Sequence, residues 1–336
     1  MKPTRILSLD GGGIRGYLTI LLLEQLVEER PTLLDEVHLF AGTSVGSIVA
    51  LALASGHSPT EVRGLFEREG KHIFPDRLLP GRRDIGRAFM AKYDNKNLKH
   101  ILTNFFQDTK LKDIDKRVLI ASFDLCRKGK EGQPPEIWDA KFFHNYPGET
   151  SDGCESIVDV ILRSSAAPFY FPSYQGYVDG FVTANNPSTC ALAKVLKASD
   201  LSLREISMLS VGTGINPRCI PDKDADWGWA NWLFRFEPLH RRYYALPLVY
   251  MMWEGSTGLA NYQCEQLLGG RFHRLDLALP TLVDIDDVKK MKLLKKVAFS
   301  DKAQEILAGT IDWLDSNSWL ECTSLEKVAA NGNKMS

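Results

Sequence analysis

Apolar residues in the first part of the chain alternate between short continuous runs and helical patterns. Ile6–Leu9 is a short apolar run that ends at an aspartate and three glycines, which is typical of a buried strand. Over Tyr17–Glu29 leucines recur at helical spacing, and this predicts a helix that ends before Pro31. Val37–Ala41 predicts a second buried strand, and Val45–Ala54 predicts a helix directly after it.

The same alternation continues through the middle of the chain. It predicts helices at Thr60–His72 and Ile157–Leu162, and strands at Val118–Phe123 and Ile206–Val211. Short apolar strands that alternate with helices are typical of a mostly parallel sheet with helices on both faces. We therefore expect an α/β fold, with the active site beyond the carboxyl ends of the strands.

Three regions depart from this alternation. Residues 74–97 are loop-like and basic, residues 227–253 are crowded with aromatic side chains, and residues 281–316 predict terminal helices. No stretch has the composition of a linker. We therefore expect one main domain, residues 1–280, with insertions near 74–97 and 220–253. Residues 281–336 are expected to form a helical extension packed on the same domain, with a frayed end.

The overall composition is that of a globular protein, with 44% apolar and 25% charged residues. The formal net charge of -1 gives no overall field to attract nucleic acid, so a nucleic acid polymer is not expected as a partner. The six cysteines are widely and irregularly spaced and include no C-x-x-C pair. That spacing argues against a disulfide framework and against a zinc site, so no metal is expected.

The N-terminus also bears on location. The apolar stretch after Arg5 is too short for the core of a signal peptide. No uninterrupted apolar run reaches the ~18 residues that a membrane-spanning helix needs. We therefore expect a cytoplasmic protein, and if it contacts a membrane we expect it to do so from the side, at the inner face.

A candidate nucleophile lies between the second predicted strand and the helix after it. Gly42, Ser44 and Gly46 fit the pattern G-x-S-x-G, with a buried strand before it and a helix behind it. In that context the serine occupies a tight turn at a helix N-terminus, where free N–H groups stabilise negative charge on a substrate oxygen. The alternative is a glycine-rich turn whose serine only caps the helix.

The glycine-rich loop after the first strand has two interpretations. Gly11, Gly13 and Gly16 satisfy G-x-G-x-x-G, so a dinucleotide site is one of them. Against it, the second strand ends in Gly-Thr-Ser instead of a ribose-binding acid, and Asp10 precedes the loop. The other interpretation is an oxyanion hole, in which glycine N–H groups converge on one point. The first two strands are expected to be neighbours, which would bring this loop to the side of Ser44.

The base that activates the serine is not evident from local motifs. Seven histidines are present, and His240 or His273 could complete a triad in the chain order of an α/β-hydrolase. That fold builds several strands before its nucleophile, whereas Ser44 follows only the second strand here. One acid stands out, because Asp179 and Gly180 form a tight turn that would expose a carboxylate, although turn aspartates are common.

Together these segments resemble the patatin-like phospholipase family. The resemblance rests on four segments, which are Asp10–Gly16, Gly42–Ser47, Ser164–Pro172 and Asp179–Pro187. Their combination and order are highly specific, and with a weaker likeness at Asn261–Leu275 they span roughly the first 280 residues. The resemblance implies a three-layer α/β/α domain related to cytosolic phospholipase A2, with a mostly parallel central sheet.

The resemblance also implies a role for each matching residue. Ser44 would be the nucleophile and Asp179 its base, in a Ser–Asp dyad without histidine and with no metal or cofactor. The oxyanion loop would comprise Gly11, Gly12, Gly13 and Arg15. One departure is visible, since Phe181 stands where the family usually has glycine or alanine after Asp-Gly. We expect the turn to survive and the substrate preference to change.

The function that follows is a lipid acyl hydrolase of the phospholipase A or lysophospholipase type. Two alternatives use the same residues or the same fold: a lipid acyltransferase, and a lipid-binding module without catalysis. Some bacterial enzymes of that family resemble this chain in length and are nucleotide-gated effectors that degrade membranes. An anionic small-molecule regulator is therefore considered as a partner, although the sequence has no motif for gating.

Two segments are candidates for contact with lipid. Residues 227–253 hold four of the seven tryptophans together with arginines, which suits either a lid or membrane-docking surface or an aromatic core beside the site. The basic residues of 74–97 could meet lipid phosphates or an anionic regulator, or form an ordinary solvated loop.

Overall fold

A computed structural model describes residues 4–74, 91–129, 132, 134, 136–220, 228–234, 246–317 and 319. The strands are β1 (Thr4–Leu9), β2 (Leu39–Thr43), β3 (Arg117–Lys128), β4 (Glu136–His144), β5 (Tyr177–Asp179), β6 (Ile206–Val211) and β7 (Phe272–Leu275). The first helices are α1 (Gly16–Glu29), α2 (Val45–Ala54), α3 (Pro59–Ile73), α5 (Lys96–Phe106) and α6 (Ile157–Ser164). The later helices are α7 (Phe181–Ala184), α8 (Ser188–Ala198), α9 (Trp229–Phe234), α10 (Pro247–Leu268), α11 (Met291–Ala298) and α12 (Asp301–Ser316).

One mixed sheet organises these elements. Its strand order is β4-β3-β2-β1-β6-β7, and the short β5 pairs with β3 outside that path. The pairs β1–β2, β1–β6, β2–β3 and β6–β7 are parallel, whereas β4 and β5 both run antiparallel to β3. The expected neighbourhood of the first two strands is confirmed, and the sheet is mostly parallel as predicted.

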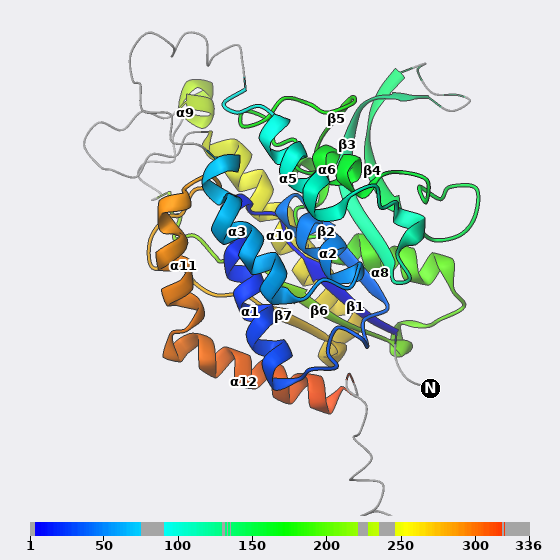
Figure 1. The fold of residues 1–336 in the computed structure, drawn as a ribbon, viewed down its shortest axis with the longest axis vertical. Helices are drawn as coiled ribbons and strands as arrows, with labels where there is room; N and C mark the ends of the chain where they lie inside the picture. Colours follow the sequence, from blue (N-terminus) through cyan, green and yellow to red (C-terminus); the bar gives the residue numbers. More distant parts are fainter. Residues whose placement is uncertain are drawn as a thin grey trace, which may run out of the picture.

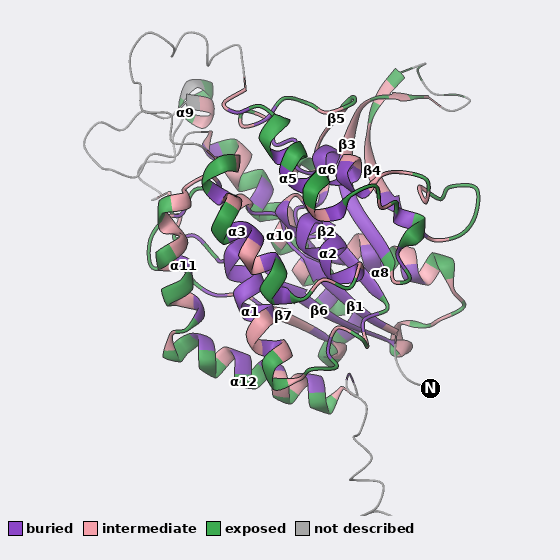
Figure 2. Ribbon diagram, viewed as in Figure 1, coloured by how far each residue is buried: buried purple, intermediate pink, exposed green. Residues whose placement is uncertain are grey.

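Side chains of the parallel strands alternate between two apolar cores, as the pleat of a strand requires. Leu7 and Phe40 belong to a large core that includes residues of α1, α2, α3, α6, α11 and α12. Their neighbours Ile6 and Leu39 belong to a smaller core formed with α8 and α10. Helices therefore cover both faces of the sheet (Figure 1). This is the predicted three-layer α/β/α arrangement, and Figure 2 shows the central strands β1, β2 and β6 almost entirely buried.

The boundaries of the predicted elements agree with the structure to different degrees. The helix at Val45–Ala54 and the strand at Ile206–Val211 have the predicted bounds. The second strand was placed two residues too early, because Thr43 still pairs with β3 while Val37 precedes the ladder. Part of the predicted loop at 74–97 is helical, since α5 begins at Lys96, and residues 75–90 lie outside the described residues.

The terminal segment packs on the first helix. Leu294 of α11 and Leu307 of α12 are buried in the larger core, together with leucines of α1. Gln25 of α1 donates a hydrogen bond to the Ala298 carbonyl (3.1 Å). The predicted tail beyond residue 319 lies outside the described residues. In the part of the chain that is described, no helix is both long enough and apolar enough to cross a bilayer.

Candidate active site

Ser44 lies in a sharp turn between β2 and α2. Its backbone has φ 54° and ψ -126°, a conformation that costs free energy for any residue with a side chain. The close approach of strand and helix explains the flanking glycines. A Cβ at Gly42 would overlap the Gly46 carbonyl, and a Cβ at Gly46 would overlap the Leu9 carbonyl. The predicted turn is therefore present, with its serine partly exposed at the N-terminus of α2.

Asp179 reaches the same point from the end of β5. Its Oδ2 accepts a hydrogen bond from the Ser44 hydroxyl (2.6 Å), and its Oδ1 accepts one from the Phe181 N–H (2.9 Å). The carboxylate is 1% exposed. Burial raises the pKa of Asp179 to about 7, although the hydrogen bonds from Ser44 and Phe181 act in the opposite direction. A carboxylate with such a pKa can accept a proton near neutral pH.

The segment Ser164–Ala166 contacts both Ser44 and the turn at Asp179. The Ser44 N–H donates to the Ser164 hydroxyl oxygen (2.9 Å), and that hydroxyl donates to the Ala121 carbonyl of β3 (2.7 Å). The N–H groups of Gly180 and Asp179 donate to the carbonyls of Ser164 (3.2 Å) and Ala166 (3.1 Å). Sequence reasoning gave Ser164 no role, although it lies in a segment that carries the family resemblance.

The glycine loop lies beside Ser44, as expected from adjacent strands. The Gly11 N–H donates to the Asn185 carbonyl (3.0 Å), so it is already engaged. The N–H groups of Gly12 and Gly13 have no acceptor among the described residues. Gly13 has φ 58°, which glycine adopts without strain, and it lines the pocket at Ser44. Of the three predicted oxyanion donors, two are thus available.

Arg15 contacts this loop through hydrogen bonds to backbone carbonyls. Its guanidinium donates to the carbonyl of Gly214 (3.0 Å) and, at longer distance, to that of Gly12 (3.4 Å). The side chain is buried and its Cζ lies 5.4 Å from the centre of the Trp253 ring. Arg15 is therefore positioned to orient the loop through the Gly12 carbonyl.

Asp10 is paired in a way that the sequence did not reveal. Arg274 of β7 binds both carboxylate oxygens of Asp10 (2.6 and 3.0 Å) and also Asp276 (2.7 Å). All three side chains are largely buried. The charge that precedes the glycine loop is therefore neutralised by a residue about 260 positions away. No pattern at Arg274 distinguishes it from a surface arginine, so only the fold could identify this contact.

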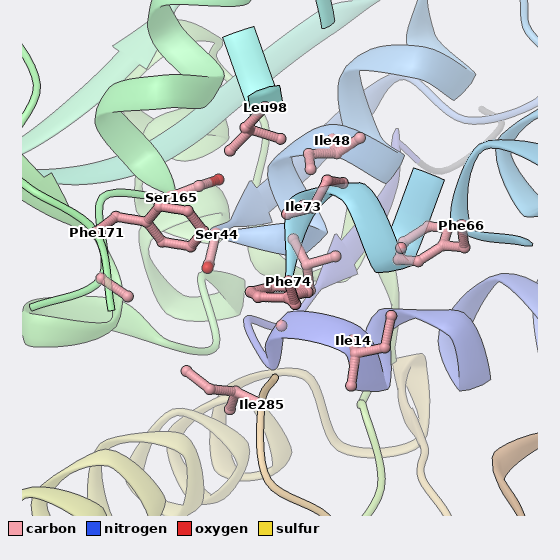
Figure 3. A pocket seen from close by; sticks show the side chains of 14 residues that line it. Ile14, Ser44, Ile48, Phe66, Ile73, Phe74, Leu98, Ser165, Phe171 and Ile285 are labelled. Atoms are coloured by element: carbon pink, nitrogen blue, oxygen red, sulfur yellow. The ribbon is translucent and has the colours of Figure 1, made fainter. Parts of the chain in front are cut away.

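An apolar cavity opens at Ser44 (Figure 3). Its walls come from the glycine loop, α2, α3, α5, the segment after α6 and the segment before α11. The lining side chains are Ile14, Val45, Ile48, Phe66, Ile73, Phe74, Leu98, Ala167, Phe171 and Ile285, with Ser44 and Ser165 as the polar ones. This apolar lining suits a hydrocarbon chain.

Of the two histidines considered for a triad, His273 lies among the described residues and His240 does not. His273 stacks on Trp313 (5.1 Å between ring centres) and its Nε2 lies 2.9 Å from the Thr310 hydroxyl of α12, so it is engaged there. His240 lies outside the described residues, as do Trp227 and residues 235–245. Trp229 is 75% exposed.

Trp253 packs on the residue that follows the turn at Asp179–Gly180. It is buried and packs on Phe181, with 5.3 Å between the ring centres. Within residues 227–253, Trp253 is therefore part of the core and Trp229 lies at the surface. The larger side chain at Phe181 is accommodated by packing on Trp253.

Comparisons with known proteins show what the chain is similar to. A family model described as patatin-like phospholipase matches residues 7–192. A Bacillus subtilis protein named putative sporulation hydrolase CotR is 35% identical over 310 residues, which is 85% of this chain and 91% of that protein. A cGAMP-activated phospholipase of Pseudomonas aeruginosa is 31% identical over 310 residues, 88% of this chain and 84% of that protein.

A solved structure was also found. The crystal structure of VipD from Legionella pneumophila has a TM-score of 0.44 and 11% identity, over 92% of this chain and 67% of that one. A likeness of this degree supports no argument about the present chain.

Proposed function

Because the chain belongs to the patatin-like phospholipase family and so to the lipid hydrolases, we propose that it cleaves fatty acyl esters of phospholipids or lysophospholipids through Ser44 and Asp179. One observation carries this proposal. The Ser44 hydroxyl donates to the buried Asp179 carboxylate (2.6 Å) at the mouth of an apolar cavity. A nucleophile, a base and a site for an acyl chain thus meet at one point.

In the first step Ser44 Oγ attacks the carbonyl carbon of the ester, and Asp179 Oδ2 takes the hydroxyl proton. The N–H groups of Gly12 and Gly13 are the proposed donors to the oxyanion, because the Gly11 N–H is engaged with Asn185. The tetrahedral intermediate then breaks its bond to the alcohol oxygen, which receives the proton from Asp179. Ser44 is left as an acyl ester and Asp179 as a carboxylate.

In the second step water replaces the alcohol and releases the fatty acid. The same residues would pass the acyl group to an alcohol or a lysolipid if one occupied the position of water. Acyltransfer is therefore the second candidate activity, and a lipid product profile separates the two. A non-catalytic lipid-binding module is disfavoured, since such a module has no need of the buried and paired carboxylate of Asp179.

The dyad is tested by removing each partner. Ser44→Ala and Asp179→Asn should each lower turnover of a short-chain nitrophenyl ester by at least ~10³-fold, because one removes the nucleophile and the other the base. Circular dichroism checks that both variants remain folded. A fluorophosphonate probe should label Ser44 in the parent chain, as read by peptide mass spectrometry.

His273→Ala is the matched control for the triad alternative, since His273 contacts α12 and is expected to leave turnover nearly unchanged. Full activity in Asp179→Asn, with loss in His273→Ala or His240→Ala, would reject the dyad. If the probe does not label Ser44, the proposal that this chain is a serine hydrolase is rejected.

Two further properties remain proposals. The names of relatives such as the P. aeruginosa enzyme support regulation by an anionic small molecule. The exposed Trp229 supports membrane contact through residues 227–253. Hydrolysis measured with and without cGAMP tests the first, and an unchanged rate speaks against it. Liposome sedimentation of Trp229→Ala tests the second, and unchanged binding places the contact elsewhere.

A further inference from the structure

Ser165 stands out in the cavity at Ser44. The cavity is apolar, and of the described side chains that line it only Ser44 and Ser165 are polar. The Ser165 hydroxyl is buried, with 8% of the residue exposed, and it has no hydrogen-bond partner among the described residues. A buried polar group without a partner is costly, so it calls for an explanation such as a bound ligand or water.

The backbone places Ser165 between the two members of the proposed dyad. The residue before it, Ser164, accepts a hydrogen bond from the Ser44 N–H through its hydroxyl oxygen. The residue after it, Ala166, accepts one from the Asp179 N–H through its carbonyl. Ser165 and Ser44 are both among the residues that line this cavity (Figure 3). The Ser165 hydroxyl, which has no partner among the described residues, therefore lines the same cavity as Ser44 and belongs to the segment that contacts both Ser44 and Asp179.

The second half of the proposed reaction needs a polar contact in this position. A water molecule that enters an apolar cavity is held only where two or more polar groups can bind it. Once Ser44 carries the acyl group, its hydroxyl no longer donates to Asp179 Oδ2, so that oxygen becomes one acceptor. Ser165 is the other polar side chain of the described lining, and it is free to bind the same water.

We propose that the Ser165 hydroxyl binds and orients the water that hydrolyses the acyl-enzyme, an inference that rests on the proposed function. The water donates one hydrogen to Asp179 Oδ2 and the other to Ser165 Oγ, which leaves a lone pair of its oxygen directed at the acyl carbon. As the new C–O bond forms, Asp179 takes one proton of the water, and the N–H groups of Gly12 and Gly13 hold the oxyanion. The bond to Ser44 Oγ then breaks, and that oxygen takes the proton back from Asp179. The products are a fatty acid and the free serine.

This role affects the two half-reactions differently. Acylation uses the Ser44 hydroxyl and requires no water, so it does not depend on Ser165. Deacylation requires an oriented water. Loss of the hydroxyl should therefore slow the second step alone, and kcat and KM should fall together while kcat/KM stays constant. A purely structural role would lower kcat/KM as well.

The experiment measures each step directly on the full chain. Ser165→Ala is acylated with a nitrophenyl ester, and decay of the adduct on Ser44 is followed by intact-protein mass spectrometry after rapid desalting. We expect the decay to be about 10-fold slower than in the parent, with an unchanged rate for the initial burst of nitrophenol. Ser165→Thr, which retains a hydroxyl, should recover most of the decay rate.

Ser55→Ala is the matched control. Ser55 also has a buried hydroxyl with no hydrogen-bond partner among the described residues, but it lies at the opposite end of α2 from Ser44. It should leave both steps unchanged. Decay in Ser165→Ala within 2-fold of the parent, or a slower burst together with an unchanged decay, would overturn the proposal. If the parent forms no adduct on Ser44, the proposed function itself fails, which is a different result.

Discussion

In the proposed mechanism, the ionisation of Asp179 sets the pH range in which Ser44 is activated. Burial raises the pKa of this carboxyl to about 7, above its usual value near 4. The proposed base is the carboxylate, so the protonated form present at low pH is inactive. We predict that kcat/KM for an uncharged ester rises about 10-fold per pH unit below pH 7 and levels off above it. A pH–rate profile between pH 5 and pH 9 checks this, and a flat profile across pH 7 would contradict it.

The same ionisation makes the stability of the folded chain depend on pH. The folded chain binds a proton at Asp179 more tightly than the unfolded chain does. Stability is therefore lost as pH rises from about 4 to about 7, and the loss persists at higher pH. Asp179→Asn, which serves as the comparison, carries no charge to bury. Its unfolding temperature should exceed that of the parent at pH 8 and approach it near pH 4.

At the scale of elements, the turn between β2 and α2 depends on the absence of side chains. A Cβ at Gly46 would overlap the carbonyl of Leu9 in β1, which is backbone and cannot move alone. We predict that Gly46→Ala lowers the free energy of unfolding by about 1–3 kcal/mol and reduces fluorophosphonate labelling of Ser44. Urea denaturation and labelling rates measure the two effects.

Gly309→Ala is the control for helical glycines. A Cβ there meets no atom within 4 Å, and the residue is exposed on α12. This substitution should raise the free energy of unfolding by up to about 1 kcal/mol, because alanine favours a helix interior over glycine. Equal labelling in Gly46→Ala and the parent would show that the turn tolerates a side chain.

At the scale of the whole molecule, the terminal helices share a core with the sheet. Leu294 of α11 is fully buried against the same apolar cluster as the side chains of α1 and α2. We predict that Leu294→Ala lowers the free energy of unfolding by about 2–5 kcal/mol. We also predict that the urea midpoint for loss of esterase activity and the urea midpoint for loss of the helical circular dichroism signal both decrease, by the same amount.

Lys296→Ala on the exposed side of α11 is the control and should change neither midpoint by much. Two separated transitions in Leu294→Ala would show that residues 281–336 unfold on their own. In that case the predicted boundary at residue 280 would separate two parts of the chain that unfold independently.

Several features could be read from the sequence because they are local. The helix at Val45–Ala54 and the strand at Ile206–Val211 have apolar patterns long enough to define their ends. The turn at Ser44 follows from small residues at two fixed positions between such elements. Shorter elements left no such signal: β5 has three residues and β7 has four, fewer than a periodic pattern needs.

The sequence by itself therefore determined the layered α/β class, the turn that presents Ser44 and, through resemblance, Asp179 as its partner. Tertiary structure decided which groups are free to act. It showed that the Gly11 N–H is engaged while those of Gly12 and Gly13 are not, and that the Ser165 hydroxyl is buried without a partner in the described chain. The physical reason is that availability depends on every neighbour in space. Ser44 and Asp179 are 135 residues apart in the chain and 2.6 Å apart between their oxygens, and only the pairing of β5 with β3 beside β2 brings them together.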